Sequence, residues 1–175
     1  MPDTIVLDQV PAPHLDPAAF RSVMRSLAAS VTVVTTAHEG VLRGLTATAM
    51  CSVSAEPPTV LVVVNRSAQS HGLIAASQFF IVNILADDQQ WLAEQFGSKT
   101  PTPFAGVGYR HAPAGGPVLH GTAGYLECSV IGANDVGTHT IFVGVVNAGA
   151  RSGRLPLLYH DGRYGLFAPL LAAAP

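Results

Sequence analysis

The sequence predicts a mainly β protein, an antiparallel barrel with a few peripheral helices. Short segments rich in valine, isoleucine and threonine recur along the chain, as is typical of strands. Turn residues separate these segments, and Asp161-Gly162 gives a strong hairpin signal. The 175 residues fit one domain, and many short strands with few helices favour a closed barrel.

The N-terminal part is predicted to contain an arm followed by a helix. Residues 1–15 show no hydrophobic period and are predicted to form an extended arm, and residues 16–170 the domain itself. Asp16 is the expected N-cap of the first helix, and Pro17 suits its first turn. The apolar residues of this helix recur at helical spacing and are interpreted as core: Phe20, Val23, Met24 and Leu27.

The remaining elements follow from β-branched runs, caps and turns. Strands are predicted at 31–36, 42–48, 59–64, 79–85, 123–131, 138–147, 157–159 and 164–167. Short helices are predicted at 67–76 and, capped by Asp87, around Trp91–Phe96. Residues 97–116 are rich in proline and glycine and are interpreted as a long loop of the functional or disordered kind.

Composition excludes several classes of partner. The net charge is −2 and Lys99 is the only lysine, so a nucleic-acid partner is not expected. The sequence has neither a long uncharged apolar run nor a signal-like N-terminus, which predicts a cytoplasmic protein with no membrane association. Only 11% of the residues are charged and 49% are hydrophobic. This excess is interpreted as a subunit interface, with a mildly apolar Gly/Ala-rich surface as the alternative.

Metal and nucleotide-fold motifs are not found. Cys51 and Cys128 are far apart and lack further ligands at metal spacing, so both are interpreted as reduced core residues. The histidines do not group at ligand spacing, and no metal site is predicted. Gly106-x-Gly108 lacks the third glycine of a dinucleotide-binding fingerprint, where His111 stands.

The stretch from Gly44 to Pro58 is the most informative part of the chain. Small residues at Thr46, Ala47, Thr48 and Ala49 allow close approach to a main chain that keeps its donors and acceptors. The stretch therefore reads as a backbone-lined shelf for a flat polar ligand such as a flavin ring. The alternative is an ordinary amphipathic strand that runs into a turn.

Four ordered blocks then carry a resemblance to a known family. The first has the pattern G-x-T-x-x-x-x-x-S-V-S-x-x-P-P, met by Gly44, Thr46, Ser52, Val53, Ser54, Pro57 and Pro58. The others are 65–71 (Asn-Arg-Ser-Ala-Gln-Ser-His), 79–85 (Phe-Phe-Ile-Val-Asn-Ile-Leu) and 137–144 (Gly-Thr-His-Thr-Ile-Phe-Val-Gly). Together they resemble the short-chain flavin reductases, including those that serve hydroxyphenylacetate hydroxylase and a pyrimidine-ring-opening monooxygenase.

The resemblance implies a specific fold and activity. It implies an FMN-binding split β-barrel, antiparallel and Greek-key-like, that works as a homodimer. The expected reaction transfers a hydride from NADH or NADPH to FMN or FAD, and the reduced flavin supplies a separate flavin-dependent monooxygenase through a transient partnership. The choice within each pair of cofactors is open.

The same resemblance assigns roles to named residues. Ser52, Val53 and Ser54 belong to the flavin shelf, and the block at 65–71 to a flavin-phosphate loop. There Asn65, Arg66, Ser67 and Ser70 are expected to hold the phosphate, with a helix N-terminus beginning near Ser67. The alternative is a plain helix cap beside a solvated arginine.

Five other positions complete the expected site, and all but Phe104 have a structural alternative. His139 is expected to face the nicotinamide side of the flavin as the catalytic candidate, or to be a structural strand histidine. Asn83 either contacts flavin or braces the sheet. Phe104 is expected near the flavin edge, reaching across a dimer, and Tyr164, with Phe167, is expected to wall the nicotinamide pocket or to lie in the core.

Two other functions are compatible with such a barrel. One is a flavin-storing or flavin-sensing module without turnover, which a sample mixed with NADH and excess flavin separates from an enzyme. The other is an oxidase of a pyridoxine-type phosphate ester, which calls for a denser basic pocket than the eight scattered arginines provide.

Overall fold

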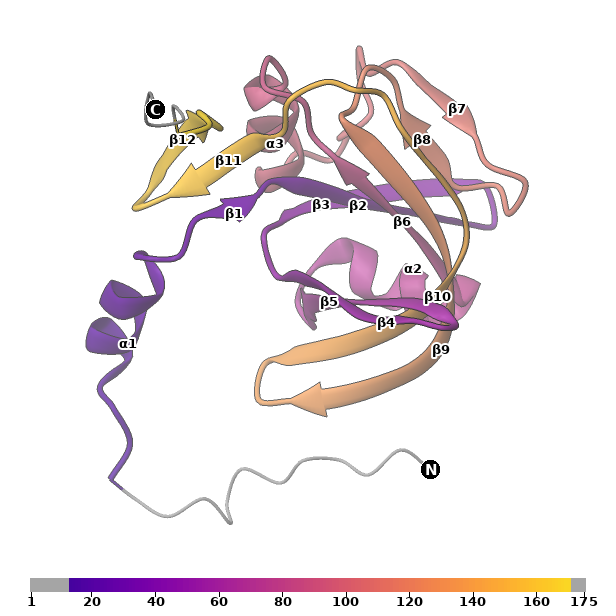
Figure 1. The fold of residues 1–175 in the computed structure, drawn as a ribbon. Coiled ribbons are helices and arrows are strands. Elements are labelled where there is room, and N and C mark those ends of the chain that lie inside the picture. Colours follow the sequence, from indigo (N-terminus) through magenta and orange to yellow (C-terminus); the bar gives the residue numbers. More distant parts are fainter. Residues whose placement is uncertain (1–12, 171–175) are drawn as a thin grey trace.

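A computed structural model describes residues 13–170 of the chain (Figure 1), so most of the predicted N-terminal arm lies outside the described residues. The predicted class is confirmed, because antiparallel strands make up most of the regular structure and the helices are short. The helices are α1 (Pro17–Met24), α2 (Gln69–Ser77) and α3 (Gln90–Gly97). Within the described range, none of them has the length and apolarity needed to cross a bilayer.

One seven-stranded antiparallel sheet forms the barrel. Its strands follow the order β3-β2-β6-β9-β10-β5-β4. They are β2 (Thr32–His38), β3 (Val41–Ala47), β4 (Met50–Ala55), β5 (Pro58–Asn65), β6 (Phe79–Ile84), β9 (Gly124–Val136) and β10 (His139–Arg151). The first and last strands of this order, β3 and β4, are consecutive in the chain, so the link between them spans the seam of the barrel.

Two smaller sheets flank the barrel. The first joins β1 (Ala29–Ser30) to the hairpin of β11 (Leu157–His160) and β12 (Arg163–Leu166), and the second pairs β7 (Tyr109–His111) with β8 (Pro117–Leu119). The hairpin prediction is confirmed: Asp161 and Gly162 both have positive φ, at 46° and 77°, as a type I′ turn requires. Strands β7 and β8 lie in and beside the segment predicted as an uninterrupted loop.

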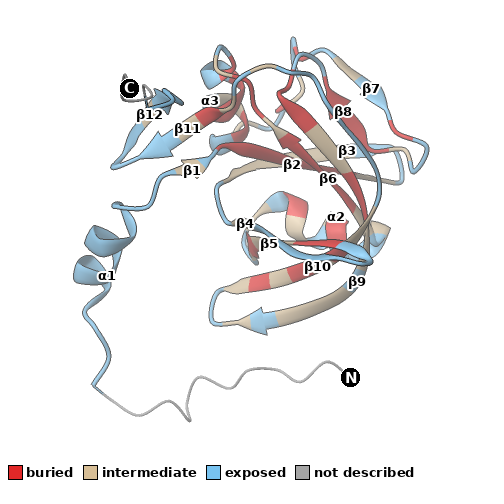
Figure 2. Cartoon of the chain, viewed as in Figure 1, coloured by how far each residue is buried: buried red, intermediate tan, exposed pale blue. Residues whose placement is uncertain are grey.

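The barrel interior is packed with aliphatic and aromatic side chains, seen as the red segments of Figure 2. Val34, Val62, Phe80 and Phe142 form its centre, and Ile74 of α2 inserts among them. A second cluster joins α3 to β2 through Leu92, Phe96 and Val33, among others. These clusters fix the positions of α2 and α3 relative to the sheet.

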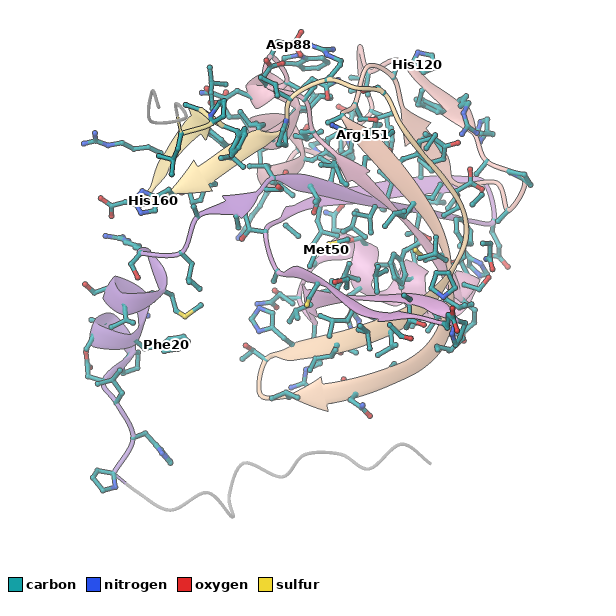
Figure 3. The ribbon with its side chains drawn as sticks, viewed as in Figure 1. Phe20, Met50, Asp88, His120, Arg151 and His160 are labelled. Carbon is teal, nitrogen blue, oxygen red and sulfur yellow. The ribbon has the colours of Figure 1, made fainter. Side chains whose placement is uncertain are left out.

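The first helix differs from the prediction. Asp16 caps it by accepting from the Ala18 and Ala19 N–H groups at 2.9 and 3.0 Å, as expected. None of its residues is buried, however, and the stripe predicted as core is exposed: Phe20 54%, Val23 63%, Met24 45% and Leu27 59%. Figure 3 shows Phe20 carried well outside the barrel strands, whereas Met50 lies within them.

Two further predictions are wrong in detail. Helix α3 is entered from Gln89 rather than Asp87, whose carboxylate instead pairs with Arg154 at 3.5 Å. Cys128 is buried as expected, but Cys51 is exposed because it lies on β4, the edge strand of the sheet.

Candidate functional site

The link between β3 and β4 is the centre of the candidate site. It consists of Thr48 and Ala49, both exposed, and crosses the seam between the two edge strands. The Ala49 carbonyl accepts from the Val63 N–H at 3.0 Å, which ties the link to β5. Among residues 13–170, the N–H groups of Thr48 and Ala49 donate to no protein acceptor. The link therefore offers small side chains and unused main-chain donors together.

Two grooves lie on either side of this link. The first, about 450 Å³, runs between the end of β3, the end of α3 and the C-terminal hairpin. The second, about 520 Å³, lies between the link, β5 and α1. Both volumes fall within the range of small-molecule sites. Thr48 and Tyr159 line both grooves. Of the predicted shelf, Thr46 and Ala47 line the first groove and Ala49 the second.

The side chain of Thr46 is used to hold the groove together. Its hydroxyl donates to the Ala93 carbonyl of α3 at 2.7 Å, and Thr32 donates to the Ala47 carbonyl at 2.6 Å. Thr46 and Ala47 are thus fixed to α3 and β2. The shelf is preorganised by these bonds.

The predicted phosphate loop lies at the same end of the sheet as the β3–β4 link. Ala49 bonds Val63, and Asn65 follows two residues later on β5, which corresponds to about 7 Å along a strand. The Asn65 Oδ1 accepts from the N–H and hydroxyl of Ser67 at 2.9 and 2.8 Å, which shapes the turn into α2.

Helix α2 begins without a side-chain cap. Its N-cap residue is Ala68, and within the described part of the chain the N–H groups of Gln69 and Ser70 have no protein acceptor. The prediction of a helix N-terminus is confirmed, but the start is Gln69 rather than Ser67. Free N–H groups and a partial positive charge at a helix start suit an anion.

Arg66 is held by the turn that joins β9 to β10. Its Nη2 donates to the Gly137 carbonyl at 2.7 Å, and its Nη1 lies 3.5 Å from Asp135 Oδ2. Its main-chain N–H donates to the Thr138 carbonyl at 3.0 Å. The structural alternative described Arg66 as a solvated arginine, whereas the structure shows it bonded to the β9–β10 turn.

His139 lies beside this loop. It pairs in register with Asn65 across β10 and β5, and its Nδ1 is 2.9 Å from the Thr138 hydroxyl. The side chain is half-buried. The β3–β4 link, the β9–β10 turn and the β11–β12 hairpin all lie on the side of the barrel that faces α1 (Figure 1).

Part of the predicted shelf lies elsewhere. Ser52, Val53 and Ser54 continue along β4 away from the link, and Ser54 pairs with Thr59 at the opposite end of β5 from Asn65. Val53 is 54% exposed, and none of the three lines either groove. The Ser54 hydroxyl bonds the Glu56 main chain at 3.1 Å. The structure therefore places these three residues apart from the link, because the extended strand carries them away from the seam.

Asn83 and Ser70 are buried, so the structure does not support the prediction that they contact the ligand. Asn83 has no exposed surface; its amide donates to the Val33 carbonyl and the Thr35 hydroxyl, both at 3.0 Å, and it accepts from Leu119 N–H at 2.8 Å. It braces the sheet, the second of the two readings. Ser70 is 1% exposed, and its hydroxyl has no hydrogen-bond partner among the residues that the structure describes, because that face of α2 packs on the barrel core.

Phe104 packs inside its own subunit. Its ring stacks edge-on against Phe96 and Tyr109, with centroids 5.0 and 5.4 Å away. It lines neither groove of its own subunit, and its reach across a dimer toward the flavin edge stays a prediction. Phe167 is likewise outside both grooves and 52% exposed.

The C-terminal hairpin contributes one predicted residue and one that the sequence reasoning missed. Tyr164 lines the first groove as expected, and Tyr159, its cross-strand partner, lines both. Burial, then the charge of Glu94 and then Tyr159, raises the pKa of Tyr164, so its phenol stays neutral. Tyr159 was readable from the hairpin, because the residues two before and two after Asp161-Gly162 face each other.

Within residues 13–170, no three potential metal-ligating side chains come together. Tyrosine rings, hydroxyls and main-chain donors line the grooves together with charged side chains, Glu94 in the first groove and Arg21, Arg25 and Asp161 in the second. Arg66 and His139 line neither groove.

A flavin reductase like domain matches residues 24–167 of the chain. Among curated proteins, the chain is 42% identical over 156 residues to the reductase component of a 4-nitrophenol 4-monooxygenase/4-nitrocatechol 2-monooxygenase from Rhodococcus opacus; this covers 89% of the chain and 83% of the relative. It is 36% identical over 166 residues to an FMN reductase (NADH) from Methylorubrum extorquens, covering 92% of the chain and 81% of that relative.

A solved structure gives the same result. The NADH:FAD oxidoreductase of Streptomyces globisporus C-1027, in complex with NAD and FAD fragments, superposes with a TM-score of 0.84. It is 33% identical to this chain, and the match covers 91% of this chain and 99% of that one.

Proposed function

The chain belongs to the flavin reductase like family and is an NAD(P)H-dependent flavin reductase, and we propose that it binds flavin along the seam between β3 and β4. The observation that carries this site is the Thr48-Ala49 link, which lies between two grooves and keeps two unused main-chain donors. Main-chain donors at a shelf with small side chains fit the polar pyrimidine edge of an isoalloxazine.

The donor set beyond the link fits the phosphate end of the same ligand. The uncapped N-terminus of α2 and the guanidinium of Arg66 supply N–H groups and positive charge next to Asn65, about 7 Å along β5 from the link. Ser67 lies in the same turn, with its hydroxyl on Asn65. We therefore assign Asn65, Arg66 and Ser67 to the phosphate side of the site.

When flavin and NAD(P)H are bound together, they supply the chemistry, a hydride transfer from nicotinamide C4 to flavin N5. The protein's part is to place two rings face to face and to exclude water. Thr46, fixed to α3, and the Tyr159–Tyr164 pair both line the first groove. We further propose that His139, which pairs with Asn65 at the start of β10 and lines neither groove, donates a hydrogen bond to the carboxamide of the nicotinamide.

We propose a homodimer in which α1 is covered by a second copy of the chain. An eight-residue helix with an exposed apolar stripe gains little stability from its own backbone, because short isolated helices are marginal in water. Phe20, Val23, Met24 and Leu27 present that stripe. A second subunit lying on it also closes the outer side of the second groove, which α1 lines through Arg21 and Met24.

The relatives place this activity in a two-component system. Because the Rhodococcus opacus relative is a reductase component, we propose that reduced flavin leaves this protein for a flavin-dependent monooxygenase. FMN and FAD both remain substrates to be compared, since the relatives include an FMN reductase and an NADH:FAD oxidoreductase. We propose a cytoplasmic location, where NAD(P)H is available and the two free thiols stay reduced.

The decisive experiment for the activity measures turnover of NAD(P)H and flavin. Purified protein is mixed with NADH or NADPH and excess FMN, FAD or riboflavin, and the loss of absorbance at 340 nm is followed. Steady consumption over many turnovers is expected, whereas flavin binding without NAD(P)H loss would indicate a storage module instead.

The site is tested by a change in the link itself. Ala49→Trp fills the space beside the exposed link without removing a core contact, and is expected to abolish flavin binding while leaving the melting temperature unchanged. Val53→Trp is the matched control. Val53 lies on β4, the strand that follows the link, but outside both grooves, so this variant should bind flavin normally.

A further inference from the structure

We propose that Asp135 is a positioning residue for the phosphate group of the flavin and that it acts through Arg66. This inference rests on the proposed function, because it concerns the phosphate side of the same site. It assigns a role to the β9–β10 turn, which lies outside both grooves and outside the phosphate loop itself.

Asp135 lies at the centre of a chain of polar contacts. Its Oδ2 lies 3.5 Å from Arg66 Nη1, and its Oδ1 accepts from the Thr140 hydroxyl at 2.5 Å. The same Thr140 hydroxyl is 2.8 Å from Nε2 of His71. The chain of contacts thus joins the turn after β5, the end of β9, the start of β10 and the first turn of α2.

The donors in this chain can be assigned from chemistry. A hydroxyl has one proton, and an ionised carboxylate only accepts, so Thr140 donates to Asp135. Thr140 must then accept from His71, which requires a proton on Nε2 of that ring. The His71 ring also packs against Phe142, with centroids 5.4 Å apart, so its orientation is fixed by the core.

Burial differs along this chain of polar contacts, and the buried end is the rigid one. Thr140 is 3% exposed, and its hydroxyl is fully used by its two partners. Arg66 and Asp135 are about half exposed, at 50% and 47% of their side chains. An exposed ion pair alone contributes little to stability. Here, however, the carboxylate is anchored from inside by the Thr140 hydroxyl, so its other oxygen presents a fixed acceptor to the Arg66 guanidinium.

The consequence concerns the direction of the guanidinium. Asp135 and the Gly137 carbonyl engage Nη1 and Nη2. The remaining N–H donors of the five that an arginine carries stay available to an anion. Arg66 lies in the turn between Asn65 and the uncapped start of α2, so an arginine held in one orientation adds a fixed positive charge to the turn that leads to the two N–H groups left free among the described residues. Fixing the arginine in advance lowers the entropic cost of binding a phosphate.

The test compares a ligand that has the phosphate with one that lacks it. Dissociation constants for FMN and riboflavin are measured by fluorescence quenching with the full-length protein. Asp135→Asn keeps an oxygen for Thr140 but removes the charge that holds Arg66. It is expected to weaken FMN binding about tenfold, the loss of one charge-assisted hydrogen bond, and to leave riboflavin binding unchanged.

Three further variants define the mechanism. Arg66→Ala should reduce the preference for FMN over riboflavin, and adding Asp135→Asn to it should cause no further loss, because the two residues act as one unit. Thr140→Val should weaken FMN binding in the same direction as Asp135→Asn. Asp88→Asn is the matched control: it breaks another carboxylate–arginine pair, with Arg154, at the far end of the molecule (Figures 1 and 3) and should change neither constant.

The outcomes separate this inference from the proposed function. Equal weakening of FMN and riboflavin in Asp135→Asn makes Asp135 a merely structural residue and overturns the inference. Tighter FMN binding also overturns it, because Asp135 would then compete with the phosphate. Wild-type protein that binds neither flavin overturns the proposed function, and the inference with it.

Discussion

Tyr159 and Tyr164 face each other across the C-terminal hairpin, with ring centroids 5.2 Å apart and planes inclined at 63°. Both rings line the first groove, and Tyr159 also lines the second. The hairpin is connected to the barrel through β1, whose Ala29 pairs with Tyr159. A separate small sheet therefore supplies an aromatic wall opposite the β3–β4 link.

The first prediction concerns this wall. Tyr164→Ala removes the ring and its edge-on contact with Tyr159, and kcat/KM for flavin reduction is expected to fall roughly tenfold. Tyr164→Phe keeps the ring and should retain most of the activity, because the phenol is neutral and its pKa is raised further by burial. Steady-state kinetics at neutral pH distinguish the two. Equal losses in both variants would assign the effect to the hydroxyl instead.

A second prediction follows from Cys128. Burial first, and then the charge of Glu127, raises the pKa of this thiol from 9.0 to about 12. Because the folded state keeps the proton that the unfolded state loses, stability is retained below pH 9 and falls as pH rises from 9 toward 12. The full difference corresponds to about 4 kcal/mol.

Urea denaturation at pH 8, 9 and 10 measures this effect. The decline in unfolding free energy with pH should be smaller in Cys128→Ala than in the wild type. Cys51→Ala, at the exposed cysteine, should follow the wild-type decline. A Cys128→Ala variant with an unaltered pH slope would show that the thiol is not the group responsible.

The third prediction distinguishes a brace from a ligand. Asn83→Ala leaves the Leu119 N–H and the Val33 carbonyl without their partner inside the sheet, and is expected to cost about 3 kcal/mol of unfolding free energy. The dissociation constant for FMN should not change in the folded fraction. A stable variant with weakened flavin binding would return Asn83 to the binding site.

The fourth prediction concerns the exposed helix. Val23→Asp places a charge in the apolar stripe of α1 and should convert the proposed dimer to a monomer, since a buried unpaired charge at an interface costs several kcal/mol. Val41→Asp is the control, because Val41 is also exposed, at 44%, but lies at the start of β3. Light scattering coupled to size exclusion gives the mass of each. A wild-type mass of one chain would contradict the dimer.

The sequence predicted the elements that local patterns determine. The β-branched runs, the Asp161-Gly162 turn and the Asp16 cap all lie where expected, because each depends on residues close in sequence. Gly44, read as part of a motif, has a packing reason that only the fold reveals. A Cβ there would lie 2.8 Å from the ring of Phe96, so the glycine lets α3 approach the sheet.

The errors have a common physical origin, which is that exposure and reach depend on distant segments. The stripe of α1 has helical spacing, but nothing in the spacing says whether the helix packs on its own barrel. Ser52 to Ser54 were grouped with the link because one family pattern contains both, although an extended strand moves about 3.3 Å per residue away from the link. Asn83 was assigned from its motif, whereas its three partners come from β2 and β8.

The seam at Thr48-Ala49 has one more consequence. Six strand pairings hold the sheet together, yet its two outermost strands, β3 and β4, are joined by the covalent chain of the link rather than by a ladder of their own, and the Ala49 bond to Val63 ties that link to β5. A flavin ring that accepts hydrogen bonds from the N–H groups of Thr48 and Ala49 bridges the two edge strands. Flavin binding and stabilisation of the seam therefore occur together. On addition of FMN, hydrogen exchange of the Thr48 and Ala49 N–H groups should slow at FMN concentrations that leave exchange in the central strands unchanged.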